Sequence, residues 1–191
     1  MTDKKEYSVI FRIMHWSIAI CMILLLLTIF LRMTWMNKHN VSDIIQEFLA
    51  DKDLSLDENL SIKLAKKIRA PMWDWHIYLG YVLVGLFALR FLLPFIGVMK
   101  FNNPFSKGLK IQQKVEYWVF ILFYLCITGS LFTGMMMEFG PEEWEHDMED
   151  IHVWSLYYLL TYIIIHIGGV VVKELTTEKG LISRVISGKN K

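Results

Sequence analysis

Four apolar blocks dominate this 191-residue sequence and leave few folds open to it. They lie at about 13–36, 76–99, 115–137 and 151–172. Each block is close to the ~20 residues that a helix needs to cross roughly 30 Å of hydrocarbon. Helices satisfy their own backbone polar groups, which lipid cannot do. Because 54% of the residues are hydrophobic, we expect an all-α integral membrane four-helix bundle that forms one domain over residues 1–191.

The connections between the blocks differ in charge, and this difference predicts the orientation of the chain. The N-terminal segment, the 95–114 connection and the tail from residue 173 onward are basic, with Lys4, Lys5, Arg12, Lys100, Lys107, Lys110, Lys114, Lys173, Lys179, Arg184, Lys189 and Lys191. The positive-inside rule predicts that these three regions, and therefore both termini, lie on the cytoplasmic side of a bacterial inner membrane. The 138–150 segment, with seven acids and no Lys or Arg, is then expected outside.

The 37–75 connection is long and nearly balanced in charge. Ser55 and Glu58 have the spacing of a capping box, which marks the start of a helix. Apolar residues follow at helical spacing, and Pro71 comes soon after, so we expect a short amphipathic helix on the outer surface. The apolar residues are Leu60, Leu64 and Ile68.

Two histidines, His152 and His166, lie fourteen residues apart in the fourth apolar block. Fourteen residues turn an α-helix through about 1,400° and raise it by ~21 Å. The two imidazoles are therefore expected on one helix face, near opposite membrane surfaces. That distance is too long for one shared ligand, but it suits two ligands stacked across the membrane.

Each of these histidines has a candidate partner at its own depth. His15 begins the first block on the cytoplasmic side, level with His166, and His76 begins the second block on the outer side, level with His152. Two axial imidazoles per iron are typical of haem b, and helical bundles hold such cofactors in their cores. We therefore predict two haems b in the bundle core, with His15, His76, His152 and His166 as iron ligands. His39 and His146 are expected to be surface residues.

Basic residues near these depths are candidates for binding haem propionates. Arg90 follows His76 by fourteen residues and so lies on the same helix face near the inner haem. An arginine fork suits a carboxylate, although snorkelling to the lipid surface also explains it. Arg12 and Lys173 are weaker candidates, because any membrane helix can end in basic residues.

Small and acidic residues give two further candidates. Gly80 follows His76 by one turn and allows close approach of a macrocycle or, equally, of another helix. Glu116 lies at the cytoplasmic entry of the third block, where a carboxylate either passes protons to a reduced quinone or is simply solvated.

The histidine pattern resembles the bacterial four-helix di-haem b-type cytochromes, including the five-sixty-one type and the cytochrome b subunits of nickel–iron hydrogenases. The matching pieces are RIMHW with His15, WHIYLGY with His76, and HVWSLYYLLTYIIIH with His152 and His166. The resemblance implies electron transfer between membrane quinone and a periplasmic partner, with the first-span histidine paired to the last. The long 37–75 connection departs from the five-sixty-one type.

Three functions are compatible with these residues. The first is a membrane electron-transfer subunit that links quinone to a periplasmic, basic redox protein or to a dehydrogenase or hydrogenase subunit. The second is an enzyme that oxidises superoxide and reduces ubiquinone; the acids at 138–150 oppose it, and Lys63, Lys66, Lys67 and Arg69 favour it. The third is an anchor or transporter without haem. Lipid is expected around the chain, no nucleic acid is expected, and a homodimer stays open.

Overall fold

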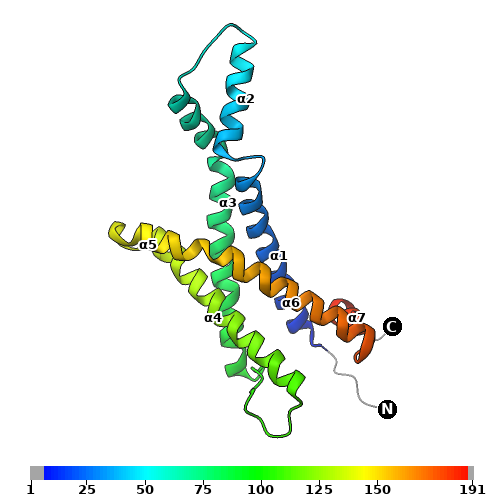
Figure 1. Cartoon of the computed structure of the whole chain (residues 1–191). Coiled ribbons are helices and arrows are strands. Elements are labelled where there is room, and N and C mark those ends of the chain that lie inside the picture. Colours follow the sequence, from blue (N-terminus) through cyan, green and yellow to red (C-terminus); the bar gives the residue numbers. More distant parts are fainter. Residues whose placement is uncertain (1–6, 189–191) are drawn as a thin grey trace. The chain divides into compact units, whose positions relative to one another are not determined.

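The computed structural model describes residues 7–188, and every regular element in that range is helical. Lys4, Lys5, Lys189 and Lys191 of the charge argument lie outside the described residues. The elements are α1 (Val9–Met33), α2 (Lys38–Ala50), α3 (Glu58–Leu92), the short 3-10 helix η1 (Leu93–Ile96), α4 (Ile111–Phe139), α5 (Glu142–Val153), α6 (Ser155–Thr176) and α7 (Leu181–Ser187) (Figure 1).

Within residues 7–188, four helical stretches are long and apolar enough to cross a membrane. They are Val9–Met33, Glu58–Ile96, Ile111–Phe139 and Glu142–Thr176. Large apolar side chains along them face outward; Ile164, for example, is 71% exposed. Such exposure is costly in water and favourable in lipid. The prediction of an all-α membrane fold is confirmed. All four stretches begin before the predicted spans, and the first two end three residues earlier than predicted, at Met33 and Ile96.

The chain forms two compact units, which we describe separately. One unit is Ile18–Gly85, and it contains most of α1, all of α2 and most of α3. The other unit combines the described part of Met1–Ser17 with Leu86–Lys191, and it contains the start of α1, the end of α3 and all of α4 to α7.

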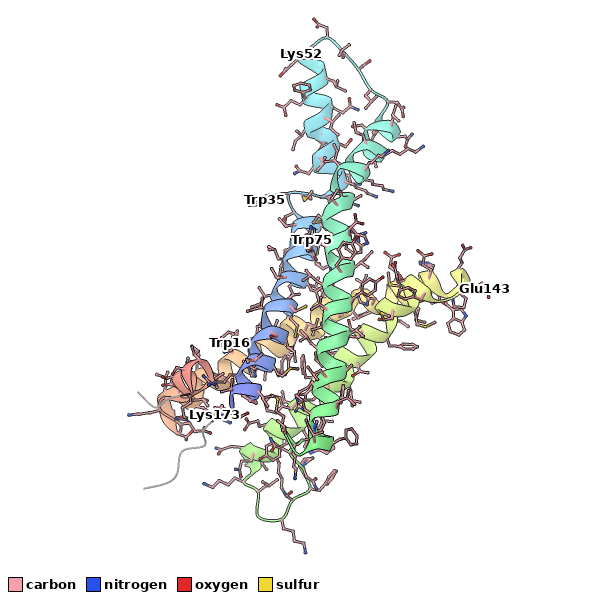
Figure 2. The ribbon with its side chains drawn as sticks, turned by 180° about the vertical axis from the view of Figure 1, so that it is seen from behind. Trp16, Trp35, Lys52, Trp75, Glu143 and Lys173 are labelled. Carbon is pink, nitrogen blue, oxygen red and sulfur yellow. The ribbon has the colours of Figure 1, made fainter. Side chains whose placement is uncertain are left out.

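In the Ile18–Gly85 unit, α2 packs against the beginning of α3 through small residues. Ser61 and Ala65 are fully buried, and the Ser61 hydroxyl lies 2.8 Å from that of Ser42 on α2. Small side chains let the two helices approach closely, and the paired hydroxyls satisfy each other. The surface helix expected from the sequence corresponds to the first part of α3. Its apolar residues Leu60, Leu64 and Ile68 are exposed. Figure 2 shows exposed Trp35 and Trp75 in the same unit.

Two local predictions for this segment are wrong. Asp57, not Ser55, caps α3, because its carboxylate accepts a hydrogen bond from the Leu60 N–H at 3.2 Å. Pro71 does not follow the end of a short helix either; it lies inside the 35-residue α3. Proline removes only one backbone donor, and the apolar residues after it continue the helix.

In the second unit, α4 packs against α5 and α6, and α6 packs against α7. The 138–150 segment, predicted as a connection, is helical over most of its length. Gly140 and Pro141 separate the end of α4 from the start of α5. The first turn of α5 is rich in Glu, which suits a helix N-terminus because of the helix dipole. Trp154 interrupts the ladder between α5 and α6. His152 therefore lies on α5 and His166 on α6, whereas we predicted one uninterrupted helix for both.

The C-terminal helix α7 is fastened to the start of α1. The Trp16 indole N–H donates to the Val185 carbonyl at 3.2 Å, and the Arg12 guanidinium donates to the Ile186 carbonyl at 3.4 Å. A cation at the C-terminal end of a helix is also favoured by the helix dipole. The pKa of the Tyr7 phenol is raised, mainly by burial and to a smaller extent by the negative charge of Glu178.

Substitution of Ala65 tests the packing of α2 on α3. We expect Ala65→Leu to destabilise this hairpin by about 1–3 kcal/mol, because the side chain is fully buried and has no room to grow. Limited proteolysis between α2 and α3 would measure the effect as faster cleavage. Ala70→Leu makes the same change at an exposed position of α3 and should cleave at the native rate. Equal cleavage of both variants would contradict the packing.

Candidate functional site

His15 and His166 lie side by side in the unit that contains α4 to α7. Their ring centres are 6.1 Å apart, with 47° between the ring planes. Aromatic rings surround the pair: Phe11 stacks on His15 at 5.9 Å, and Tyr162 stacks on His166 at 5.5 Å. Both imidazoles are partly buried, so the pair occupies an apolar, sheltered position.

This pair has the donor set and spacing for one iron ion. Two imidazoles on one ion need metal–nitrogen bonds of about 2 Å each, which puts their ring centres roughly 6 Å apart. A bis-histidine haem needs only these two protein ligands. Residues 7–188 contain no group of three or more His, Cys, Asp or Glu side chains that could hold a metal ion.

His152 is held on α5 by hydrogen bonds to α4. Its Nδ1 lies 3.0 Å from the Ser130 carbonyl oxygen and 3.0 Å from the Thr133 hydroxyl. A carbonyl only accepts, so Nδ1 carries the proton and the lone pair of the neutral ring is on Nε2. Metal-binding histidines use this arrangement, in which the distal N–H fixes the ring and the other nitrogen binds the metal.

His76 shows the same arrangement in the Ile18–Gly85 unit. Its Nδ1 lies 2.7 Å from the hydroxyl of buried Thr28 on α1. That hydroxyl donates its proton to the Leu25 carbonyl at 2.6 Å, so it accepts from His76 Nδ1. The lone pair of His76 is thus on Nε2. Trp73 stacks on the imidazole at 4.7 Å and restricts its rotation further.

Arg90 is a buried cation with incomplete protein pairing. It is 7% exposed, and its guanidinium carbon lies 4.3 Å above the Phe101 ring and 5.4 Å from the Tyr124 ring. Among the described residues, its Nη1 has no hydrogen-bond partner. A buried charge is costly unless an anion pairs with it, and cation–π contacts compensate only in part. Arg90 therefore fits a carboxylate such as a haem propionate.

The other basic candidates have protein partners. Arg12 binds the end of α7, as described above. Lys173 on α6 forms an ion pair with Glu116 on α4, with Nζ and Oε2 2.5 Å apart. Glu116, considered above as a residue that passes protons to a reduced quinone, is thus paired across the two helices.

Gly80 has open space where a side chain would be. A Cβ built there would meet no atom of the described residues within 4 Å. Helix packing among those residues therefore does not account for the glycine, and the space is compatible with close approach of a flat ligand.

A profile of the prokaryotic cytochrome b561 family matches residues 6–188, which is nearly the whole chain. The chain belongs to this family. No curated protein and no solved structure matches it significantly. Membership of this family implies b-type haem binding and a role in membrane electron transfer. Together with the four apolar helices, it indicates a multi-pass bacterial membrane protein.

Sequence reasoning missed the residues that orient the histidines of this cytochrome. Thr28 and Thr133 lie inside apolar blocks and are buried, and buried hydroxyls need partners. That requirement could have marked them as candidates, but their distances along the chain from His76 and His152 indicate no pairing. Gly134 was likewise missed as a contact: a Cβ there would lie 3.1 Å from His152 Cε1.

Gly134→Ala tests whether the position of His152 matters for haem binding. The added methyl group would push the His152 imidazole by a few tenths of an ångström and disturb its hydrogen bonds to α4, and we expect haem retention to fall by about tenfold or more. Haem per chain, measured from the pyridine haemochrome spectrum after purification, reports the loss. Gly129→Ala on the same helix meets no atom within 4 Å and should retain haem fully. Equal haem content in both variants would show that the Gly134–His152 contact has no role.

Proposed function

We propose that this cytochrome is a di-haem electron carrier between the membrane quinone pool and a periplasmic redox protein. The observation that carries the proposal is the His15–His166 pair, whose 6.1 Å ring separation suits one iron. His76 and His152, matched in depth by the sequence, are the proposed ligands of the second haem. Each haem, when bound, supplies an iron that accepts or gives one electron.

The residues of the chain would prepare both sites for outer-sphere transfer. Two histidine ligands on each iron would leave no coordination site for a substrate. The hydrogen bonds that His76 Nδ1 donates to the Thr28 hydroxyl and His152 Nδ1 donates to the Ser130 carbonyl would keep Nε2 of each ring directed to the metal. Arg90 would pair with a propionate of the inner haem, which supports the proposal because its Nη1 has no partner among residues 7–188.

The exposed acids of α5 indicate the kind of redox partner. Its residues Glu142, Glu143, Glu145, Asp147, Glu149 and Asp150 are all exposed, and Figure 2 shows Glu143 near the start of the helix. A negative field attracts a basic protein and accelerates its association. We infer a basic partner on the outer side of the inner membrane, with both termini of the cytochrome in the cytoplasm.

A superoxide:ubiquinone oxidoreductase on this scaffold is the second candidate. Lys63, Lys66 and Lys67 are exposed on α3 and would attract an anion, whereas α5 would repel it. Haem reduction by superoxide that slows sharply with added salt would favour this enzyme. A rate that does not depend on salt would favour the electron carrier.

The test of the function is haem content together with reduction by quinol. Purified protein should hold two b-type haems per chain, and a quinol should reduce both. Two haems that no quinol reduces would remove the quinone part of the proposal. Absence of haem from protein purified under haem-sufficient conditions would remove the whole of it.

Single histidine substitutions test the ligand assignment. His152→Ala should remove the outer haem and spare the inner one, and His166→Ala should do the converse, because each change removes one of two axial ligands. Haem per chain should fall from two to one in both variants, and redox titration should show a different remaining component in each. His146→Ala, at an exposed residue of α5, is the control. Two haems with native spectra in either variant would disprove the assignment.

A further inference from the structure

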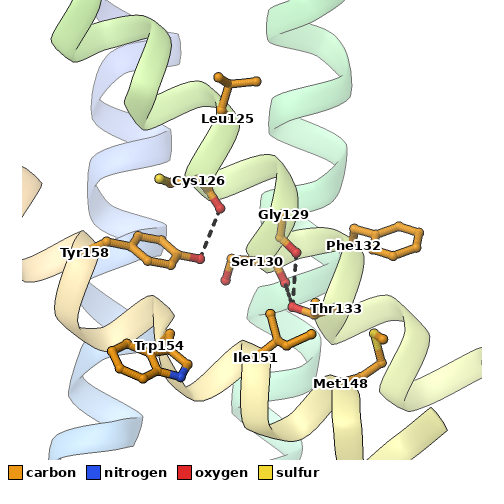
Figure 3. A pocket seen from close by; sticks show the side chains of 10 residues that line it. All are labelled: Leu125, Cys126, Gly129, Ser130, Phe132, Thr133, Met148, Ile151, Trp154 and Tyr158. Carbon is orange, nitrogen blue, oxygen red and sulfur yellow. Dashed lines mark hydrogen bonds between the residues drawn. The ribbon is translucent and has the colours of Figure 1, made fainter.

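The candidate haem ligands differ in how their imidazoles are held. Ser130 and Thr133, drawn on α4 in Figure 3, are the hydrogen-bond partners of His152 Nδ1. No hydrogen bond within the described part of the chain reaches the imidazole of His15 or of His166. Metal-binding histidines are usually oriented by a hydrogen bond of their second nitrogen. The orientation of the inner pair therefore depends on packing.

Two aromatic side chains of α1 define the plane of the His15 ring. Phe11 lies parallel to it, with 7° between the ring planes and 5.9 Å between the ring centres. Trp16 meets it edge-on, at 83° and 5.5 Å. The Trp16 indole restricts the His15 ring only while its own rotamer is fixed. Its N–H donates to the Val185 carbonyl at 3.2 Å, so α7 fixes a side chain that packs on a proposed ligand.

The same end of α7 is fastened to α1 a second time. Arg12, one turn before His15, donates to the Ile186 carbonyl at 3.4 Å. The last carbonyls of a helix have no partner within it, and α1 thus satisfies two of those in α7. Gly188 ends the helix with a φ of 76°, and a Cβ there would lie 2.9 Å from Arg12 Cζ. Glycine therefore lets the Arg12 side chain lie against the end of α7.

The opposite end of α7 is held by α6, the helix of the second proposed ligand (Figure 1). Glu174, in the last turn of α6, accepts hydrogen bonds from the backbone N–H groups of Gly180 and Ile182 at 2.8 and 2.9 Å. Between the two ends, Leu181 and Arg184 are buried. A helix of seven residues is marginal by itself, so α7 depends on these contacts. It connects the end of α6 to the start of α1.

We propose that α7 is a positioning element for the inner haem, because it joins the two helices that carry His15 and His166 and so sets the separation and angle of their rings. The inference rests on the proposed function, since it takes these histidines as ligands of one iron. The quantities that α7 would fix are the 6.1 Å between the ring centres and the 47° between the ring planes. In a bis-histidine haem the angle between the imidazole planes changes the splitting of the iron d orbitals. The largest g value of the oxidised haem therefore reports that angle.

Electron paramagnetic resonance of the oxidised, haem-loaded, full-length protein in nanodiscs tests this role. Trp16→Phe removes the hydrogen bond from α1 to α7, and Glu174→Ala removes the cap that α6 supplies. We expect each variant to shift or broaden the largest g value of the inner haem and to leave the outer signal native. The His152→Ala protein identifies the inner signal, because it should keep only that haem. Trp35→Phe and Glu143→Ala make the same changes at exposed positions and should give native spectra.

Limited digestion with trypsin shows whether α7 has been released in the same samples. Arg184 is buried, so cleavage after it requires α7 to open. We expect cleavage about fivefold faster in both test variants, because loss of a capping contact raises the population of the open form. Since Glu174 bonds to α7, a spectral change in that variant would reach the haem through α7.

Several outcomes would overturn the role of α7. Faster cleavage with a native inner signal would show that α7 does not set the ring angle. A native cleavage rate in both variants would show that these contacts do not hold α7. Loss of the inner haem alone would support the proposal, whereas equal loss of both haems would overturn it, because the effect would then be general.

The unmodified protein separates this inference from the proposed function. If it holds two low-spin haems and the spectra of the variants stay native, only the role of α7 fails. If it holds no low-spin haem, or if His15→Ala leaves the inner signal unchanged, the ligand assignment fails and this inference fails with it.

Discussion

Hydrogen bonding of imidazoles inside apolar helices is the constraint on which the rest of this cytochrome depends. A neutral imidazole has one donor and one acceptor, and lipid satisfies neither. At His76 and His152 the donor is satisfied by Thr28 and by Ser130, each on a neighbouring helix. The same bond sets the tautomer, so that the lone pair of each ring is on Nε2, the atom that would bind a metal in the proposed sites. Helix packing and ligand chemistry are thus linked at these two residues.

Much of the architecture could be predicted from the sequence, because it follows from length and polarity. Apolar blocks of sufficient length specify membrane helices, and histidines within them are unusual enough to mark a cofactor. The proximity of His15 and His166 matches an expectation based only on depth. Arg90 was expected near the inner haem because of its spacing from His76. In the structure its side chain is buried.

The misses involve helix ends and small residues, where several weak preferences compete. Ser55 and Asp57 both suit an N-cap, and only the final geometry selects Asp57. Pro71 is a strong breaker in general, yet α3 continues through it. No proline or glycine near Trp154 indicates the break between α5 and α6. Contacts such as Ser42 with Ser61 join residues whose pairing depends on how α2 folds back, which local sequence does not encode.

The attachment of α7 to α1 has a consequence for biosynthesis. His15 lies between Arg12 and Trp16, and both of these residues donate hydrogen bonds to carbonyls of the last turn of α7. His166, whose ring centre lies 6.1 Å from that of His15, is made some 150 residues later. The start of α1 therefore waits for residues 181–187 to be synthesised before it gains these contacts. A cofactor held by His15 and His166, as proposed above, would have to be inserted after both histidines are made, and termination before residue 181 would leave the start of α1 without α7.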